Sequence, residues 1–125
     1  MKDLALGYGM HLTLDGYDCS PSKLANLDII YEFLDHCPDL IKMTKIMPPY
    51  AFKYRGKVPE DWGLSGFVLI AESHISIHTW PELGMAVCDI FTCGDHTKPK
   101  EGVKYMKMML DSKSIVSKSF TRPLE

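Results

Sequence analysis

Apolar and polar residues alternate one by one in three separate parts of this chain of 125 residues. The alternation begins at Tyr8, returns around Ile75 and Ile77, and appears again in residues 84–92. Because successive side chains of a strand point to opposite faces, each part predicts a β-strand with one buried face. The apolar members are Met10, Leu12, Leu14, Ile75, Ile77, Ala86, Cys88 and Ile90.

Helical spacing appears twice between these strands. Ser20 and Pro21 predict an N-cap followed by proline at the first helical position, with an apolar stripe that ends near Cys37 and Pro38. Residues 100–110 predict a second helix with one apolar face. The stripes consist of Leu24, Leu27, Tyr31 and Leu34 in the first helix and of Val103, Met106 and Leu110 in the second.

Four further segments complete the expected fold. Residues 41–47 and 115–120 predict short strands, and the apolar run 67–71 predicts a strand buried on both faces. Residues 48–62 predict a loop, and a loop of this length in a small domain is more often functional than idle. We therefore expect one α+β domain over residues 1–125, a two-layer α/β sandwich whose antiparallel sheet has its helices on one face.

Composition and charge exclude several classes of protein. Apolar residues make up 46% and charged residues 24% of the chain, as in ordinary globular domains. The net charge of −2 argues against nucleic acid or an anionic membrane surface as a partner. The longest apolar run, residues 67–71, is far shorter than the roughly 20 residues that a transmembrane helix needs.

The start of the chain and its cysteines predict a cytoplasmic protein. The first residues lack the apolar stretch and the cleavage site of a signal peptide. The four cysteines contain no Cys-x-x-Cys pair, and we expect them to be free thiols in a reducing compartment.

Reactive side chains concentrate in residues 72–82 and 88–96. Five of them are possible zinc ligands, but their spacing matches no known zinc pattern, and His74 and His78 would be spread along a strand. We therefore expect no metal site. A serine hydrolase is also disfavoured, because Ser73 has no Gly-x-Ser-x-Gly surroundings. The five ligands considered are His74, His78, His96, Cys88 and Cys93.

Three stretches of the sequence together resemble one known family. They read Leu-Ile-Ala-Glu-Ser-His-Ile-Ser-Ile-His-Thr-Trp-Pro-Glu at 69–82, Phe-Thr-Cys-Gly at 91–94 and Gly-Met-His-Leu at 9–12. They are similar to the short prokaryotic S-adenosylmethionine decarboxylases, a pyruvoyl-dependent family with arginine and ornithine decarboxylases among its relatives. The resemblance covers nearly the whole chain, is poor only in residues 45–61, and implies that family's α/β sandwich fold.

The resemblance implies that the chain cleaves itself between Glu72 and Ser73 and so makes its own cofactor. The Ser73 hydroxyl would attack the Glu72 carbonyl to form an ester, and elimination and hydrolysis would leave a covalent pyruvoyl group. This chemistry needs a strained, well-held peptide. The products would be a β chain of residues 1–72 and an α chain of residues 73–125. The pyruvoyl carbonyl would condense with a substrate amine and take up electrons as carbon dioxide leaves.

Four further residues match functional positions of the family. His78 would remove a proton during self-processing, and Cys93 would assist processing and reprotonate the substrate carbon. Ser65 would assist processing, and Glu82 would hold the ribose hydroxyls of an adenosyl substrate.

The resemblance implies a homodimer. Positions 73 and 78 lie five apart, so on a regular strand their side chains face opposite ways. Either Ser73 lies off the regular strand or a second copy of the chain donates His78, and in the family that this chain resembles the sites lie between two protomers. We therefore expect Ser73 and Cys93 of one chain to meet Ser65, His78 and Glu82 of the other.

The sequence departs from the family's pattern at the substrate site. Members that use S-adenosylmethionine usually have an aromatic residue that stacks on adenine where this chain has Pro59. Asp15 stands where glutamate is common, and Gly16 where a larger residue is usual. Trp62 or Tyr54 could supply the missing ring, because any flat π-face can stack on a base.

The substrate therefore has two candidates. Because Glu82 is kept, we expect S-adenosylmethionine, whose decarboxylation supplies aminopropyl groups for spermidine in polyamine biosynthesis. Glu60 and Asp61 could instead pair with the cation of ornithine or arginine, or be ordinary solvated loop charges. A non-catalytic paralogue that activates a sister enzyme is disfavoured, because the processing serine and its two catalytic partners are all present.

Overall fold

The computed structural model describes residues 8–94 and 97–123. The strands are β1 (Tyr8–Tyr17), β2 (Tyr50–Arg55), β3 (Trp62–Ile70), β4 (Ser73–Trp80), β5 (Met85–Cys93) and β6 (Ser114–Pro123). The helices are α1 (Pro21–Leu24), α2 (Leu27–Leu40) and α3 (Lys100–Leu110), and a short 3-10 helix, η2, spans Pro81–Leu83.

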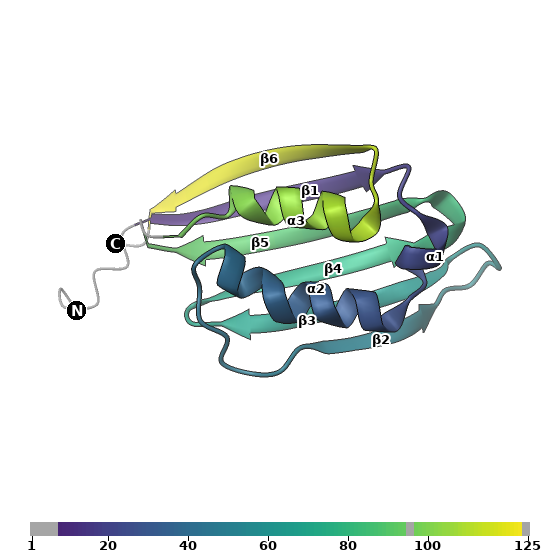
Figure 1. Ribbon diagram of the computed structural model, residues 1–125, viewed down its shortest axis with the longest axis horizontal. Helices are drawn as coiled ribbons and strands as arrows, with labels where there is room; N and C mark the ends of the chain where they lie inside the picture. Colours follow the sequence, from purple (N-terminus) through teal and green to yellow (C-terminus); the bar gives the residue numbers. More distant parts are fainter. Residues whose placement is uncertain (1–7, 95–96, 124–125) are drawn as a thin grey trace.

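All six strands form one sheet in the order β2-β3-β4-β5-β1-β6, and every neighbouring pair is antiparallel. Figure 1 shows α2 lying across β3 and β4, and α3 across β5 and β1, on the same face of the sheet. The apolar residues of that face and of the helices form one buried cluster. The predicted α+β sandwich with helices on one face is confirmed. We call the other side of the sheet, which carries no helix in the described part of the chain, the open face.

The strands predicted from alternation are confirmed as β1, β4 and β5. Leu12, Leu14, Ile75, Ile77 and Ile90 are at most 2% exposed, so their alternation marks the face under the helices. The second predicted helix coincides with α3, and the closing strand is β6, which extends further at both ends than predicted.

The predictions for residues 41–47 and 48–62 are wrong. Residues 41–42 form a turn after α2, and a single bridge between Lys45 and Ile70 is the only strand-like pairing before β2 in this described segment. Part of the expected loop is strand β2 instead. β2 is an edge strand whose side chains are largely exposed, so charged residues in it cost little folding free energy. These charged residues obscure in the sequence the alternation of Tyr50, Phe52 and Tyr54.

The apolar run at 67–71 is not buried on both faces. Val68 and Ile70 lie under the helices, whereas Phe67 is 37% and Leu69 is 42% exposed on the open face. A continuous apolar run therefore marks here a strand with one face in the core and an apolar surface on the other.

The first predicted helix consists of two helices. Asn26 interrupts it, and its side-chain oxygen caps α2 by accepting bonds from the backbone N–H groups of Asp28 and Ile29. Leu27 and Tyr31, which the predicted stripe placed in the core, are 44% and 41% exposed. The stripe fails because the break at Asn26 changes the phase of the helix: the buried residues of α2 are Ile30, Phe33, Leu34, Cys37 and Pro38.

The predicted start of the first helix is confirmed, because Ser20 is the N-cap residue of α1 and Pro21 its first residue, although the Ser20 side chain makes no capping bond. At the other end the prediction differs, because α2 continues past Pro38 to Leu40. Within residues 8–94 and 97–123, no helix is long and apolar enough to cross a membrane.

Candidate functional site

The hairpin between β3 and β4 contains the peptide at which cleavage is expected. Ile70 pairs with Ser73, so Ala71 and Glu72 are the two central residues of the turn. Glu72 has a φ of 64°, in the left-handed region that residues with a Cβ rarely adopt. Such a conformation costs of order 1–2 kcal/mol for a residue other than glycine and persists only where neighbours enforce it.

Ser73 and Cys93 lie on either side of this peptide. The Ser73 side chain is 8% exposed, and its buried hydroxyl has no hydrogen-bond partner among the described residues. The Cys93 thiol, at the end of β5, donates to the carbonyl oxygen of Glu72 at 3.2 Å. One carbonyl therefore has an unpartnered hydroxyl on the next residue and a thiol donor from the neighbouring strand.

Thr92 is a residue of this region that the sequence analysis missed. Its hydroxyl is the second buried side-chain oxygen without a partner among the described residues. Thr92 follows Phe91, which pairs with His74, so it lies beside the start of β4. Burying a hydroxyl unpaired costs about 1–3 kcal/mol, so two of them at one place mark a polar site rather than a core.

A second group of residues lies at the other end of β3 and β4. Ser65 and His78 are partners in the register of these strands, and the Ser65 Oγ lies 2.8 Å from the His78 Nδ1. His78 is exposed on the open face, whereas Ser65 is 7% exposed. This geometry suits proton exchange between a hydroxyl and an imidazole.

Five hydrogen-bonding side chains lie near this second group. Both carboxylate oxygens of Asp61 are used, one by the Tyr54 hydroxyl at 2.8 Å and the other by the Trp80 indole at 3.3 Å. The bond to Asp61 raises the pKa of Tyr54. The Trp62 indole donates to Glu82 at 3.3 Å. Together these bonds connect β2, β3, β4 and η2.

The loop between β2 and β3 forms a cavity beside these residues. Its volume is about 550 Å³, and Pro59, Asp61 and Trp62 contribute to its lining together with cationic side chains of the hairpin. The Lys53 ammonium lies 5.0 Å from the centroid of the Trp62 ring, and Glu60 is exposed in the loop. Of the predicted substrate residues, Asp61 and Trp62 line this hollow at the edge of the sheet, whereas Glu82 lines a different cavity beside η2.

The two groups do not meet within one chain. Ser73 and His78 are five residues apart on β4, which corresponds to about 17 Å along a strand. Ser73 lies on the face under the helices and His78 on the open face, as the alternation predicted. The structure thus contains two partial sites, one around Ser73 and Cys93 and the other around Ser65, His78 and Glu82.

A row of aromatic side chains crosses the open face near the Ser73 end of β4 and was not recognised in the sequence. Phe91 lies between His74 and His11, with ring centroids 5.8 Å and 6.3 Å away. His11 Nε2 also lies 3.0 Å from a carboxylate oxygen of Asp89. The His11 ring contacts the ring of Phe120 in β6 edge-on. The alternation could have predicted this row, because the residues that alternate with the buried ones in β1, β4 and β5 all lie on the open face.

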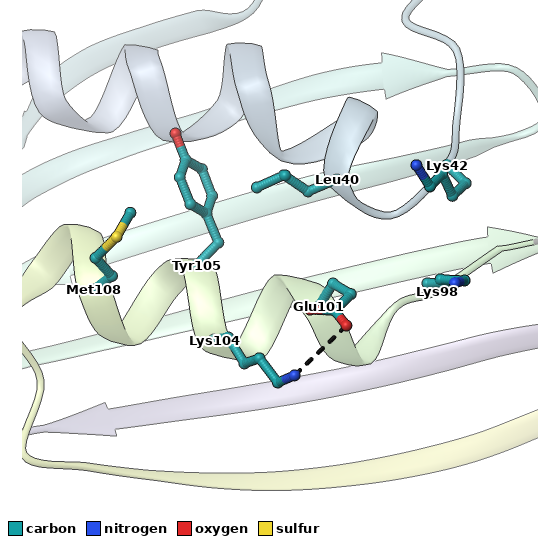
Figure 2. A pocket seen from close by; sticks show the side chains of 7 residues that line it. All are labelled: Leu40, Lys42, Lys98, Glu101, Lys104, Tyr105 and Met108. Atoms are coloured by element: carbon teal, nitrogen blue, oxygen red, sulfur yellow. Dashed lines mark ion pairs between the residues drawn. The ribbon is translucent and has the colours of Figure 1, made fainter.

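Other parts of the chain carry less of the predicted chemistry. In residues 8–94 and 97–123 no three His, Cys, Asp or Glu side chains form a metal-binding group, and His96 lies outside the described residues. A cavity of about 390 Å³ between α2 and α3 is lined by none of the predicted site residues (Figure 2). Its lining consists of Leu40, Lys42, Lys98, Glu101, Lys104, Tyr105 and Met108.

Comparisons with known proteins agree on one family. A family model described as S-adenosylmethionine decarboxylase matches residues 10–123. The S-adenosylmethionine decarboxylase proenzyme of Thermoplasma acidophilum is 34% identical over 119 residues, which cover 95% of this chain and 86% of that protein. The corresponding proenzyme of Aquifex aeolicus is 37% identical over 112 residues, or 90% of this chain and 78% of that protein. The crystal structure of the adenosylmethionine decarboxylase from Aquifex aeolicus matches with a TM-score of 0.76 at 33% identity, over 95% of this chain and 93% of that one.

Proposed function

This chain belongs to the S-adenosylmethionine decarboxylase family, and we propose that it cleaves itself before Ser73 and decarboxylates S-adenosylmethionine with the resulting pyruvoyl group. Its product would supply aminopropyl groups for spermidine. Relatives that match most of the chain are named proenzymes, which supports a precursor that is processed. The observation that carries the proposal is the buried, unpartnered Ser73 hydroxyl next to a carbonyl that already accepts the Cys93 thiol.

Self-cleavage would begin with an acyl shift. The Ser73 Oγ attacks the Glu72 carbonyl carbon, the carbon–nitrogen bond of the peptide breaks, and the Ser73 nitrogen takes up the hydroxyl proton. Loss of the Ser73 α-proton then eliminates Glu72 as a free carboxylate and leaves dehydroalanine. Addition of water releases ammonia and leaves the pyruvoyl group as the new amino-terminal end of the α chain.

The residues around Ser73 fit this chemistry. The thiol of Cys93 donates to the oxygen on which negative charge develops when the carbonyl is attacked. The left-handed φ of Glu72 raises the energy of the intact peptide, which favours the ester. His78 of a second copy of the chain, paired there with Ser65, is the base that we assign to the α-proton.

Substrate binding would use the second group of residues. When formed, the pyruvoyl group supplies an acceptor for the electrons of the breaking carbon–carboxylate bond. Cys93 would return a proton to the substrate carbon, and Glu82 would accept hydrogen bonds from the ribose hydroxyls. The Trp62 ring, tied to Glu82 by its indole nitrogen, would take the place of the aromatic residue that is missing at Pro59.

The geometry of Asp61 weighs against ornithine or arginine as the substrate. Both of its carboxylate oxygens already accept hydrogen bonds, from Tyr54 and Trp80. A substrate cation would have to compete with these two bonds, which already engage both oxygens of the carboxylate. Asp61 therefore fits better as a residue that positions the aromatic side chains of the site.

A homodimer would join the two partial sites. The open face carries large exposed apolar side chains, which a second copy of the chain would bury. Pairing by a two-fold axis brings the Ser73 end of one chain to the His78 end of the other and makes two equivalent sites. The exposed apolar residues of this face are Tyr17, Tyr50, Phe52, Tyr54, Phe67, Leu69, Val116 and Phe120.

The state of the cysteines bears on the cellular compartment of the protein. All four are buried free thiols. This state suits a reducing compartment, and we propose the cytoplasm.

The test separates cleavage from substrate choice. Freshly made wild-type protein should convert from one chain into fragments of 72 and 53 residues, and Ser73→Ala should remain one inactive chain. Each form is then incubated with carboxyl-labelled S-adenosylmethionine, ornithine or arginine, and released carbon dioxide is collected. We expect release only from S-adenosylmethionine and only by cleaved protein.

A matched serine variant controls for the loss of a hydroxyl. Ser117→Ala, at an exposed position of β6, should cleave and turn over like the wild type. Two normal fragments from Ser73→Ala would refute the cleavage site, and carbon dioxide from ornithine or arginine alone would refute the substrate.

A further inference from the structure

Residues 44–46 run beside the end of β3, directly behind the turn that contains Glu72. The backbone N–H of Ala71 donates to the carbonyl of Thr44 at 2.8 Å, and the N–H of Ile46 donates to the carbonyl of Leu69 at 3.2 Å. Between these bonds, Lys45 and Ile70 form an antiparallel bridge. The last residues before the turn are thus paired with a segment outside the sheet.

This segment is itself fixed to helix α2. The Lys45 ammonium forms an ion pair with Asp35, and both side chains are only about 30% exposed. The pairing with Asp35 raises the pKa of Lys45. At the start of the segment, Met43 is buried and its N–H donates to the carbonyl of Pro38 in the last turn of α2. The contacts therefore run from the helix through residues 44–46 to Ala71.

The position of these contacts matters for the turn. A two-residue hairpin turn is normally stabilised by its own strands and favours glycine or asparagine where φ is positive. Here the first central residue, Ala71, donates its N–H to Thr44, and the second, Glu72, is left-handed although it is a glutamate. Because Ala71 is held on one side and the Glu72 carbonyl on the other by Cys93, Glu72 cannot relax without breaking one of these bonds.

We propose that residues 44–46, fixed to α2 by the Asp35–Lys45 pair, position the Glu72 carbonyl for attack by the Ser73 hydroxyl. This inference rests on the proposed self-cleavage. The segment acts at the acyl shift, in which the bond from Ser73 Oγ to the Glu72 carbon forms and the peptide bond breaks. It touches none of the reacting atoms and is a positioning element. Once Glu72 is a free chain end, its conformation no longer affects turnover.

Ile46 offers a direct test with a matched control. Its side chain is 63% exposed, so Ile46→Ala removes little packing and keeps the backbone N–H. Ile46→Pro removes that N–H and with it the bond to Leu69, and proline also favours the extended conformation that Lys45 already has in its bridge. Cleavage is followed after cell-free synthesis by denaturing gel electrophoresis. We expect Ile46→Pro to cleave roughly threefold to tenfold more slowly than Ile46→Ala, the factor that one lost hydrogen bond corresponds to.

Asp35→Asn tests the attachment to α2 without changing the backbone. The control is Glu32→Gln, which neutralises an exposed carboxylate one turn earlier on the same helix. Asp35→Asn should slow cleavage by a similar factor, whereas Glu32→Gln should cleave at the wild-type rate. The cleaved fraction of Asp35→Asn should then release carbon dioxide at the wild-type rate per processed chain.

The outcomes separate this inference from the proposed function. If the wild type cleaves and both Ile46→Pro and Asp35→Asn cleave as fast as their controls, the positioning role is refuted and self-cleavage stands. The positioning role is also refuted if the processed Asp35→Asn chains release carbon dioxide as much more slowly than the wild type as they cleave, because the segment would then act on the whole site. If the wild type never cleaves, the proposed function and this inference fall together.

Discussion

Cys93 differs from the other described cysteines in what its sulfur contacts. Its thiol donates to the Glu72 carbonyl, whereas Cys37 and Cys88 are enclosed in the apolar core. Burial raises the pKa of Cys37 to about 12 and that of Cys88 well above its ordinary value. Both thiols are almost completely buried, so a substrate cannot reach them.

Cys93→Ala should therefore impair both self-cleavage and decarboxylation. We expect turnover per processed chain to fall by about 100-fold or more, the usual effect of removing a general acid. Carbon dioxide release and the amount of cleaved chain are measured on the same samples.

Cys19→Ala is the matched control for this prediction. Cys19 is also buried, and its thiol pKa is raised mainly by burial, but it lies at the end of β1 away from Glu72. Its variant should keep activity within about twofold of the wild type, and Cys37→Ala should behave likewise. Equal losses of activity in the Cys93→Ala and Cys19→Ala proteins would mean that Cys93 contributes only to packing, as Cys19 does.

At the scale of elements, strands with one buried face could be predicted from sequence. β1, β4 and β5 alternate because they separate the helix layer from the open face. The sequence analysis did not predict β2, because an edge strand tolerates charged residues. It also did not predict the break at Asn26, because the apolar residues of the two helices fit a single helical spacing. Both errors arise where tertiary position, rather than periodicity, decides the structure.

Part of the candidate site could likewise be predicted from the sequence, and part could not. The resemblance predicts roles for Ser65, Ser73, His78 and Cys93, which stay predictions, whereas alternation correctly put Ser73 and His78 on opposite faces. The contact from residues 44–46 to Ala71 could not be predicted, because it joins a segment without regular structure to a turn. Backbone pairing of this kind leaves no pattern in side-chain polarity.

The capping of α2 gives a prediction at this scale. Asn26→Ala should destabilise the protein by about 1 kcal/mol, because two backbone N–H groups of α2 lose their shared acceptor. Thermal unfolding of the processing-deficient Ser73→Ala protein measures the change without a mixture of cleaved and intact chains. In the same background Ser20→Ala should shift the midpoint little, since the Ser20 side chain caps no helix N–H and the variant keeps the backbone carbonyl. A larger loss for Ser20→Ala than for Asn26→Ala would contradict the assignment of the cap.

At the scale of the whole molecule, a single chain holds the two halves of the proposed site apart. The Ser73 and Cys93 end and the Ser65 and His78 end lie about 17 Å from each other along β4. The open face between them carries exposed aromatic residues and the paired His11 and Asp89. A second copy of the chain would bury this face and complete both sites at once.

Co-expression of two inactive variants tests this arrangement directly. Ser73→Ala lacks the processing serine and His78→Ala lacks the base, so each should be inactive alone. In a mixed dimer, the intact Ser73 end of the His78→Ala chain meets the intact His78 end of the Ser73→Ala chain. Half of the dimers are mixed and each has one complete site of two, so up to about a quarter of wild-type carbon dioxide release should return.

The matched control pairs two changes at the same end of the chain. Ser73→Ala co-expressed with Cys93→Ala leaves every site of every dimer without one of these two residues, because both come from the end that contains the cleavage site. This mixture should stay near the level of the Cys93→Ala protein alone. Recovery in the control as large as in the Ser73→Ala and His78→Ala mixture would mean that Ser73 and Cys93 of one site come from different chains. No recovery in either mixture would mean that each site is built within one chain. In that case β4 would have to bend in the active protein, because its regular geometry keeps Ser73 and His78 on opposite faces.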